Sequence, residues 1–453
     1  MEQQKHIINK VFLEVGTNSN ELAHKFKDNL AVFFKYQVFP KIENYFEKYY
    51  PEASDITMRF NKVEIDINKV DIDHFPEIAN RIVEQFKKKM DSIIRRAGIH
   101  PQDNNEWTLI TKSKSKLDAF LYFLKTGYKP WWSPNLQSIL TLQNIKIIKS
   151  ENGFYSEIVK ALAFKTVRER LVNQFKNEVL WIILRTSDSE KTLTKQKVFK
   201  ILDKNKVLRY HFWNAIIEHY TLQRISTIKD TLNHLKTVKK SIDAEDFSTL
   251  KTFIASIIEK PIEKVETFQF RAKETTNNPT EILVTEAEDG FFVDNAGLVI
   301  MHPFLKHLFK NAKLIDSNGK IKPSKIETAI HLLHYLSTKK QQQLESELVL
   351  EKFLCGYPIS KPMSRFIKLP KVLKQMADEV LQSAISHWIA VKNTSPDGLR
   401  TGFLQREGKL VIENDTGRLI IERKGQDVLL DKIPWNINLI KLPWRDKIIY
   451  VEW

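Results

Sequence analysis

The sequence predicts an α+β protein: a small N-terminal mixed αβ unit, a long helical middle, and a helical C-terminal core ending in an antiparallel sheet. Two observations predict this class. Apolar residues recur at helical spacing through most of the chain, whereas strict alternation is confined to the region before Val70 and the region after Arg400. Turn residues separate the alternating runs at the C-terminal end.

Length and composition indicate a folded chain of more than one domain. The protein has 453 residues, of which 42% are hydrophobic and 28% charged, with only 13 Gly and 16 Pro. These values exclude a disordered or collagen-like protein. The composition shifts predict four parts: an N-terminal α+β unit at 1–110, a basic mainly helical region at 111–270, a helical core at 280–390 and a terminal antiparallel sheet at 391–453.

The N-terminal unit reads as strand, helix, strand, helix. Residues 6–15 and 58–70 alternate and are predicted strands. Residues 20–50 and 76–96 have helical spacing, and the first of these two helices is predicted to break near Pro40.

Helices dominate from there to residue 390, and strands follow. A helix at 117–126 is predicted to end at Gly127, a residue suited to a helix C-terminus. Further helices are predicted at 290–311, 326–336, 344–355 and 369–390. Short strands are predicted at 409–413, 418–423, 426–431, 436–440 and 447–452, with a turn at 414–417.

The chain is strongly basic, with a formal net charge of +16. Residues 165–240 hold 17 Lys and Arg against 7 Asp and Glu, a net charge of +10. The excess either solvates helices or binds an acidic surface such as nucleic acid. We favour solvation, with weak nonspecific nucleic-acid binding, and keep a basic nucleic-acid-binding protein as the alternative function.

Cellular context follows from one cysteine and from the apolar runs. Cys355 stands alone, which excludes an intrachain disulfide and fits a reducing compartment. No apolar run approaches the roughly 20 residues needed to span a bilayer. The first ten residues lack the apolar stretch of a signal peptide. We therefore expect a protein made and folded in the cytoplasm.

Histidines and the cysteine offer the main candidates for chemistry. His331 and His334 share a helix face, and with His302 and Cys355 they would supply four zinc ligands. Their spacing matches no established zinc motif, so packed, hydrogen-bonded histidines are the favoured interpretation. Cys355 follows the apolar run 349–354, so we expect a buried thiol rather than a nucleophile. We expect no enzyme, no cofactor and no metal.

Acidic residues near the second predicted strand are a further metal candidate. Glu64, Asp66, Asp71 and Asp73 lie close together in sequence. Glu64 and Asp66, however, belong to the solvent face of an alternating run, which favours a surface role.

Five of the 9 Trp stand in or beside a Pro-Trp pair or at the terminus: Trp131, Trp132, Trp435, Trp444 and Trp453. Buried Trp usually finds a partner for its indole N–H, and exposed Trp gathers at interfaces. For Trp453 we expect either closure of the sheet or a subunit contact.

Residues 295–309 hold a further set of special residues. Asn295 and Gly297 precede His302, Pro303 and Phe304. They form either a partner-docking loop or a Gly-requiring turn in which Pro303 opens a helix. A single Gly does not make a phosphate-binding loop, so we expect no phosphate site here.

Several of these motifs, in this order, resemble the contractile injection system tape measure family. The N-terminal match consists of residues 13–15 and 63–67, although the Gly that usually ends the family's second strand is absent here. The remaining matches are 120–132, 295–309, 329–336, 347–350, 352–358, 403–408 and 434–453, so the resemblance runs from about residue 5 to 453 and is weakest at 180–285. The motif and interface candidates are Trp131, Trp132, Asn295, Gly297, His302, Pro303, Phe304, His331, His334, Cys355, Gly356, Arg406, Glu407, Trp435, Pro443, Trp444 and Trp453.

The resemblance implies an architectural role in a phage-tail-like particle. The implied partners are tube, baseplate or terminator subunits, with no cofactor, and the protein would be incorporated into the particle. A literal length ruler would be a long continuous helix that rises about 1.5 Å per residue. Frequent helix breakers and a terminal sheet instead favour a compact tip, plug or assembly-guiding part.

Overall fold

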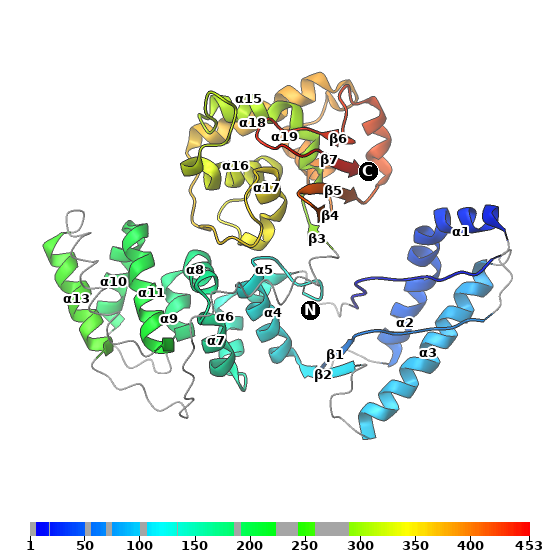
Figure 1. The fold of residues 1–453 in the computed structure, drawn as a ribbon, viewed down its shortest axis with the longest axis horizontal. Helices are drawn as coiled ribbons and strands as arrows, with labels where there is room; N and C mark the ends of the chain where they lie inside the picture. Colours follow the sequence, from blue (N-terminus) through cyan, green and yellow to red (C-terminus); the bar gives the residue numbers. More distant parts are fainter. Residues whose placement is uncertain are drawn as a thin grey trace. The chain divides into compact units, whose positions relative to one another are not determined.

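A computed structural model of the protein describes residues 6–17, 19–49, 56–68, 75–99, 107–133, 135–184, 192–222, 243–258 and 290–453. The chain forms two compact units, Met1–Leu117 and Asp118–Trp453. Figure 1 shows the elements of both. The α+β class predicted from the sequence is confirmed, while the finer division into four parts stays a prediction.

Three helices form the core of the first unit. A π-helical turn, Phe34–Val38, joins α1 (Asn20–Phe33) to α2 (Phe39–Tyr49), so the predicted break near Pro40 is present. The third helix, α3 (Phe75–Ile99), is amphipathic and extends three residues beyond its predicted end. The buried side chains of this core recur at helical spacing: Phe33, Val38, Ile42, Tyr45, Ile78, Ala79, Ile82, Val83, Phe86 and Met90.

The strands of the first unit differ from those predicted. The β1 strand (Ile56–Phe60) pairs antiparallel with β2 (Trp107–Thr111), whereas residues 6–17 and 61–68 belong to no sheet of the described residues. Alternation nevertheless persists along 61–68. Val63, Ile65 and Ile67 contact the helical core, while Lys62, Glu64 and Asp66 are exposed. Side chains alternate along an extended backbone whether or not it is hydrogen-bonded into a sheet. The alternating pattern therefore predicted correctly which side chains face the core, but its prediction of a paired strand was wrong.

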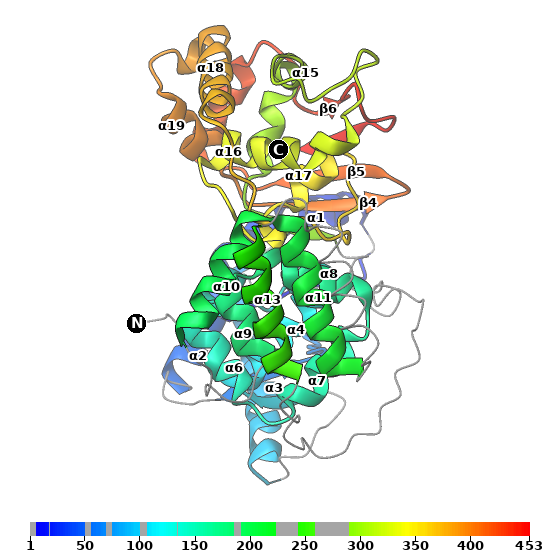
Figure 2. The same ribbon diagram turned by 90° about the vertical axis from the view of Figure 1, so that its left-hand side faces the viewer.

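The first half of the second unit is a set of packed helices. The predicted helix at 117–126 begins earlier, as α4 (Lys112–Thr126), and stops before Gly127 as expected. In Figure 2 the helices α9, α10, α11 and α13 lie side by side. The remaining helices of this half are α5 (Leu136–Ile139), α6 (Leu142–Lys149), α7 (Phe154–Leu162), α8 (Lys165–Gln174), α9 (Asn177–Leu184), α10 (Thr192–Lys204), α11 (Lys206–Leu222) and α13 (Ala244–Ile258).

The second half of this unit begins with a strand, where helical structure was predicted. The segment predicted as helical at 290–311 consists of β3 (Phe291–Val293), a 3-10 helix (Ala296–Met301) and α15 (His302–Asn311). The predicted helix at 326–336 is confirmed as α16 (Ile326–Thr338). The other helices here are α17 (Val349–Leu354), α18 (Lys371–His387), α19 (Pro396–Leu399), a π-helical turn (Arg400–Leu404) and the 3-10 helices Pro323–Lys325, Glu345–Glu347, Ile389–Val391 and Gly425–Lys432.

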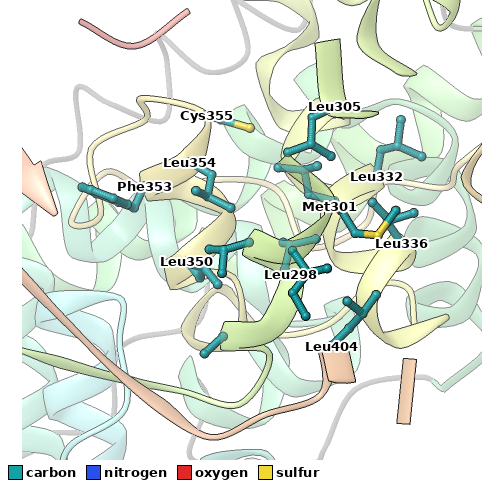
Figure 3. Close-up of a cluster of buried hydrophobic side chains, with 14 of the residues drawn as sticks. Leu298, Met301, Leu305, Leu332, Leu336, Leu350, Phe353, Leu354, Cys355 and Leu404 are labelled. Atoms are coloured by element: carbon teal, nitrogen blue, oxygen red, sulfur yellow. The ribbon is translucent and has the colours of Figure 1, made fainter. Parts of the chain in front are cut away.

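One apolar core holds the C-terminal half together. Figure 3 shows it where the 3-10 helix at 296–301, α15, α16 and α17 meet. Its labelled members are Leu298, Met301, Leu305, Leu332, Leu336, Leu350, Phe353, Leu354, Cys355 and Leu404. Among the helices that the structure describes, none has the length and apolar character to cross a membrane.

The C-terminal sheet has five strands in the order β3-β4-β5-β7-β6. A two-residue turn joins β4 (Gly408–Glu413) to β5 (Thr416–Ile421), with positive φ at both Asn414 and Asp415, as a type I′ hairpin requires.

Two details of the sheet correct the sequence prediction. The segment predicted as a strand at 426–431 is a 3-10 helix, and β7 (Ile449–Glu452) runs parallel to β5. The chain leaves β5 through that helix, forms β6 (Leu439–Ile440) at the edge of the sheet, and then turns back as β7 between β6 and β5, which makes β7 antiparallel to β6 and parallel to β5.

Candidate functional site: a buried polar joint

A loop between α17 and α18 is held by side chains along its whole backbone. Each carbonyl oxygen from 359 to 364 accepts a side-chain hydrogen bond, and we call this segment the carbonyl loop. Lys352 Nζ donates to the carbonyl oxygens of Ile359 and Lys361 (2.8 Å each), and Arg170 donates to that of Ser360. Tyr357 donates to the carbonyl oxygen of Pro362, Gln174 to that of Met363 and His331 Nε2 to that of Ser364, each at 2.8 Å.

Two of these donors come from α8, in the other half of the unit. Arg170 and Gln174 lie one helical turn apart, so they share a face of α8 and reach the same loop. Gln174 also accepts the backbone N–H of Glu345 at 2.8 Å. In return, Arg365 at the end of the carbonyl loop donates its backbone N–H to the carbonyl oxygen of Asn173 at 3.1 Å. The loop and α8 are thus connected from both sides.

Three fully buried charged groups lie at the centre. The carboxylate of Glu345 accepts from Arg170 Nε at 3.3 Å and from Lys352 Nζ at 2.6 Å, and none of the three side chains is exposed. Burial lowers the pKa of Lys352 to about 8, and the nearby Glu345 opposes that shift. We call Arg170, Gln174, His331, Glu345, Lys352 and the carbonyl loop the polar joint.

Gly127 is required by this arrangement. Its φ is +88°, and a Cβ there would lie 2.5 Å from Glu345 Oε1 and 2.9 Å from Arg170. Arg170 Nη1 also donates to the carbonyl oxygen of Leu124 in the last turn of α4, at 2.6 Å. The glycine that ends α4 therefore leaves room for the ion pair, beyond its role in ending the helix.

The two helix histidines take different partners. His331 belongs to the polar joint, and its burial lowers its pKa to about 4. His334 Nδ1 donates to Glu351 at 2.7 Å, and the amide of Asn295 donates to the same carboxylate oxygen at 2.6 Å. Asn295 also bonds Ser337 at 3.0 Å. Both histidines are packed and hydrogen-bonded, as the favoured interpretation expected.

The other residues of the 295–309 motif serve close packing. A Cβ on Gly297 would overlap the carbonyl oxygen of Phe403, so this contact between two helical turns admits only glycine. Pro303 lies in the first turn of α15. His302 Nε2 donates to the carbonyl oxygen of Asn436 at 2.7 Å, and the ring of Phe304 meets Trp435 edge-on at 5.2 Å.

The motif tryptophans of the C-terminal half bond inward. Trp435 donates to the carbonyl oxygen of Ile300 at 3.0 Å, and Trp444 to that of Leu354 at 2.8 Å. Trp453 Nε1 donates to Asp427 Oδ2 at 2.9 Å, and Arg406 donates to the same oxygen at 2.5 Å. The ring of Trp131 meets that of Trp132 edge-on at 5.9 Å. Three other motif candidates, Gly356, Glu407 and Pro443, are exposed, and Gly356 has a φ of +69°.

No metal-ligand cluster forms among the residues that the structure describes, counting groups of three or more His, Cys, Asp or Glu. Cys355 is buried, and burial raises the pKa of its thiol well above the usual range. Glu64 and Asp66 are exposed, while Asp71 and Asp73 lie outside the described residues.

Part of the basic stretch is internal. Arg168, Arg170 and Arg209 are buried, and all three donate to backbone carbonyl oxygens. These arginines stabilise the fold and present no charge to a ligand. The described lysines of α10 at 197, 200 and 204 are exposed.

Sequence reasoning missed the ion pair of the joint. Glu345 and Lys352 lie within the run 344–355, where most residues are apolar, and a charged residue inside such a run was the available signal. Arg170 carried no corresponding signal because its partner is 175 positions away.

Comparison with known proteins adds the family. The sequence model of the protein family described as contractile injection system tape measure protein matches residues 5–453. No curated protein and no solved structure matches the chain. Since the match covers nearly the whole chain and contains every motif and joint residue described above, this protein belongs to the contractile injection system tape measure family.

Proposed function

We propose that this structural protein is a compact, non-enzymatic assembly part of a phage-tail-like injection system. It is made in the cytoplasm, binds tube, baseplate or terminator subunits, and joins the particle. It does not measure tube length by its own extension.

The polar joint carries this proposal. Its bonds connect residues 175 to 190 positions apart, through side chains that are buried. Extending the chain as a ruler would break these bonds and leave Glu345 and Lys352 as unpaired charges, which is costly in a protein interior. The longest helix of the described residues, α3, has 25 residues and so spans only about 37 Å.

A non-enzymatic role is supported by the state of the candidate groups. The Cys355 thiol is buried with a raised pKa, and the rings of His331 and His334 are buried, with one nitrogen of each hydrogen-bonded inside the protein. Nucleophilic catalysis requires an accessible thiolate and an available base.

Exposed apolar residues on two neighbouring 3-10 helices supply a docking surface for a partner subunit. Ile389 is 75% exposed and Val428 64% exposed, on helices that contact each other. Exposed apolar side chains gather at protein interfaces, and the contact between the two helices places these two residues on neighbouring segments. The double variant Ile389→Asp/Val428→Asp should fold but fail to join particles. Val207→Asp is the matched control, because Val207 is 58% exposed on α11.

A deletion series tests the role in length. Deleting the gene should abolish sheathed particles or leave aberrant ones. In-frame deletions between 180 and 285 should give normal tubes or none, measured as tube-length distributions by electron microscopy. A length that falls by about 1.5 Å for each residue removed would establish a ruler instead.

A further inference from the structure

The segment before α1 displays apolar side chains to solvent. Between residues 7 and 15, six large apolar side chains are exposed, and Phe12 is the most exposed of them at 80%. Such a concentration of exposed apolar surface marks an interaction site. The six are Ile7, Ile8, Val11, Phe12, Leu13 and Val15.

This segment resembles a strand that lacks a sheet. Residues 6–17 have neither helix nor turn, and Figure 1 draws them as an extended ribbon that leads into α1. No sheet of the described residues includes them. The start of the segment is anchored, because the ring of His6 stacks on Phe46 of α2 at 4.5 Å.

The sequence of the segment is complementary to itself in one antiparallel register. Lys10 and Glu14 lie two residues before and two residues after Phe12. If two copies pair with Phe12 opposite Phe12, Lys10 of each copy faces Glu14 of the other. Directly opposite unlike charges and aromatic pairs both stabilise antiparallel strands.

On the other face of the same register the central pairs are apolar, while Asn9 faces Val15 further from the axis. There, Val11 of each copy lies opposite Leu13 of the other. A two-fold axis through Phe12 produces all these pairs at once, as an isologous interface requires.

We propose that residues 7–17 form an antiparallel strand pair with the same residues of a second copy of this chain. The proposal goes beyond the assembly role and does not depend on it. Within one chain, residues 61–68 are the competing partner, because they too are extended and outside a sheet.

Mixing charge variants tests the register. In Lys10→Glu both cross-strand pairs become Glu–Glu, and in Glu14→Lys both become Lys–Lys. Each variant alone should dimerise about tenfold or more weakly than the wild type. An equimolar mixture should regain the dimer, because every pair is then Glu–Lys again. Sedimentation velocity of the purified full-length chain measures this.

Disulfide trapping supplies an independent readout. Phe12→Cys should give a covalent dimer on mild oxidation, because the two residues face each other across the axis. Val15→Cys is the control, since its two copies would lie about 20 Å apart. The native Cys355 is buried and does not compete.

Two results would overturn the proposal. One is a wild-type chain that remains monomeric at high concentration while Phe12→Cys gives no dimer, as pairing with 61–68 of the same chain predicts. The other is equal cross-linking at both cysteine positions, which would show contact without this register.

Discussion

Arg170 and Glu345 form an ion pair across 175 positions of the chain, with both side chains fully buried. Lys352 bonds the same carboxylate at 2.6 Å, so two cations share one anion in a solvent-free place. A charge in such a place is stabilised only by its partners and its hydrogen bonds. The pair therefore ties the correct placement of α8 to the stability of the C-terminal half.

Replacing Arg170 should destabilise the second unit. Arg170→Met leaves Glu345 with Lys352 alone and frees the carbonyl oxygens of Leu124 and Ser360. We expect a loss of about 3–5 kcal/mol in the free energy of unfolding. Urea unfolding followed by tryptophan fluorescence measures it.

The control for that change is Lys165→Met on the same helix. The Lys165 side chain is 75% exposed, and its pair with Glu169 spans 3.9 Å. Its removal should change the unfolding free energy by no more than about 0.5 kcal/mol. Equal midpoints for both variants would show that the joint contributes little to stability.

His331 should make stability depend on mildly acidic pH. Burial lowers its pKa from 6.5 to about 4, so between these values the unfolded chain binds more protons than the folded one. Stability should therefore fall as pH decreases from 6.5 to 4, by about 3 kcal/mol from this group.

The measurement is the difference in unfolding free energy between wild type and His331→Gln at several pH values. Glutamine can still donate to the carbonyl oxygen of Ser364, but it does not titrate. The variant should lose this share of the pH dependence. His387→Gln, at an exposed position on α18, should keep it. Identical pH profiles for wild type and His331→Gln would contradict the prediction.

The C-terminal strand should be needed for folding. Deleting residues 448–453 removes β7, which lies between β5 and β6, and with it two ladders of hydrogen bonds. We expect insolubility or a large loss of stability. Trp453→Phe keeps an aromatic ring but removes the N–H that reaches Asp427, and the loss of that hydrogen bond should cost about 1 kcal/mol.

Thermal melting of these variants checks this, with Tyr450→Phe as the control because Tyr450 is 48% exposed. A truncated protein that melts like the intact one but fails to join particles would assign Trp453 to a subunit interface.

Nucleic-acid binding by the basic stretch should be weak and unselective. Lys197, Lys200 and Lys204 are exposed on α10 at spacings that share one face. Their binding to a short DNA duplex should fall steeply with salt, because counterion release drives it. The triple Lys→Glu variant should abolish it in fluorescence anisotropy. Tight, sequence-selective binding at physiological salt would favour the alternative function, a basic nucleic-acid-binding protein.

Local signals in the sequence predicted those features that depend on a few neighbouring residues. The break near Pro40, the end of α4 at Gly127 and the hairpin turn at Asn414 each follow from the backbone preferences of one or two residues. Strand pairing was less predictable. Residues 6–17 and 61–68 alternate but join no described sheet, and β7 runs parallel to β5, because a ladder depends on a partner from elsewhere in the chain.

The sequence by itself determined the α+β class, most helices and the family, since these depend on periodicity and on motifs in a given order. The tertiary structure alone decided the polar joint. Whether Arg170 is a surface cation or half of a buried ion pair depends on where α8 packs. That position results from apolar contacts summed over the whole unit, which no short stretch of sequence contains.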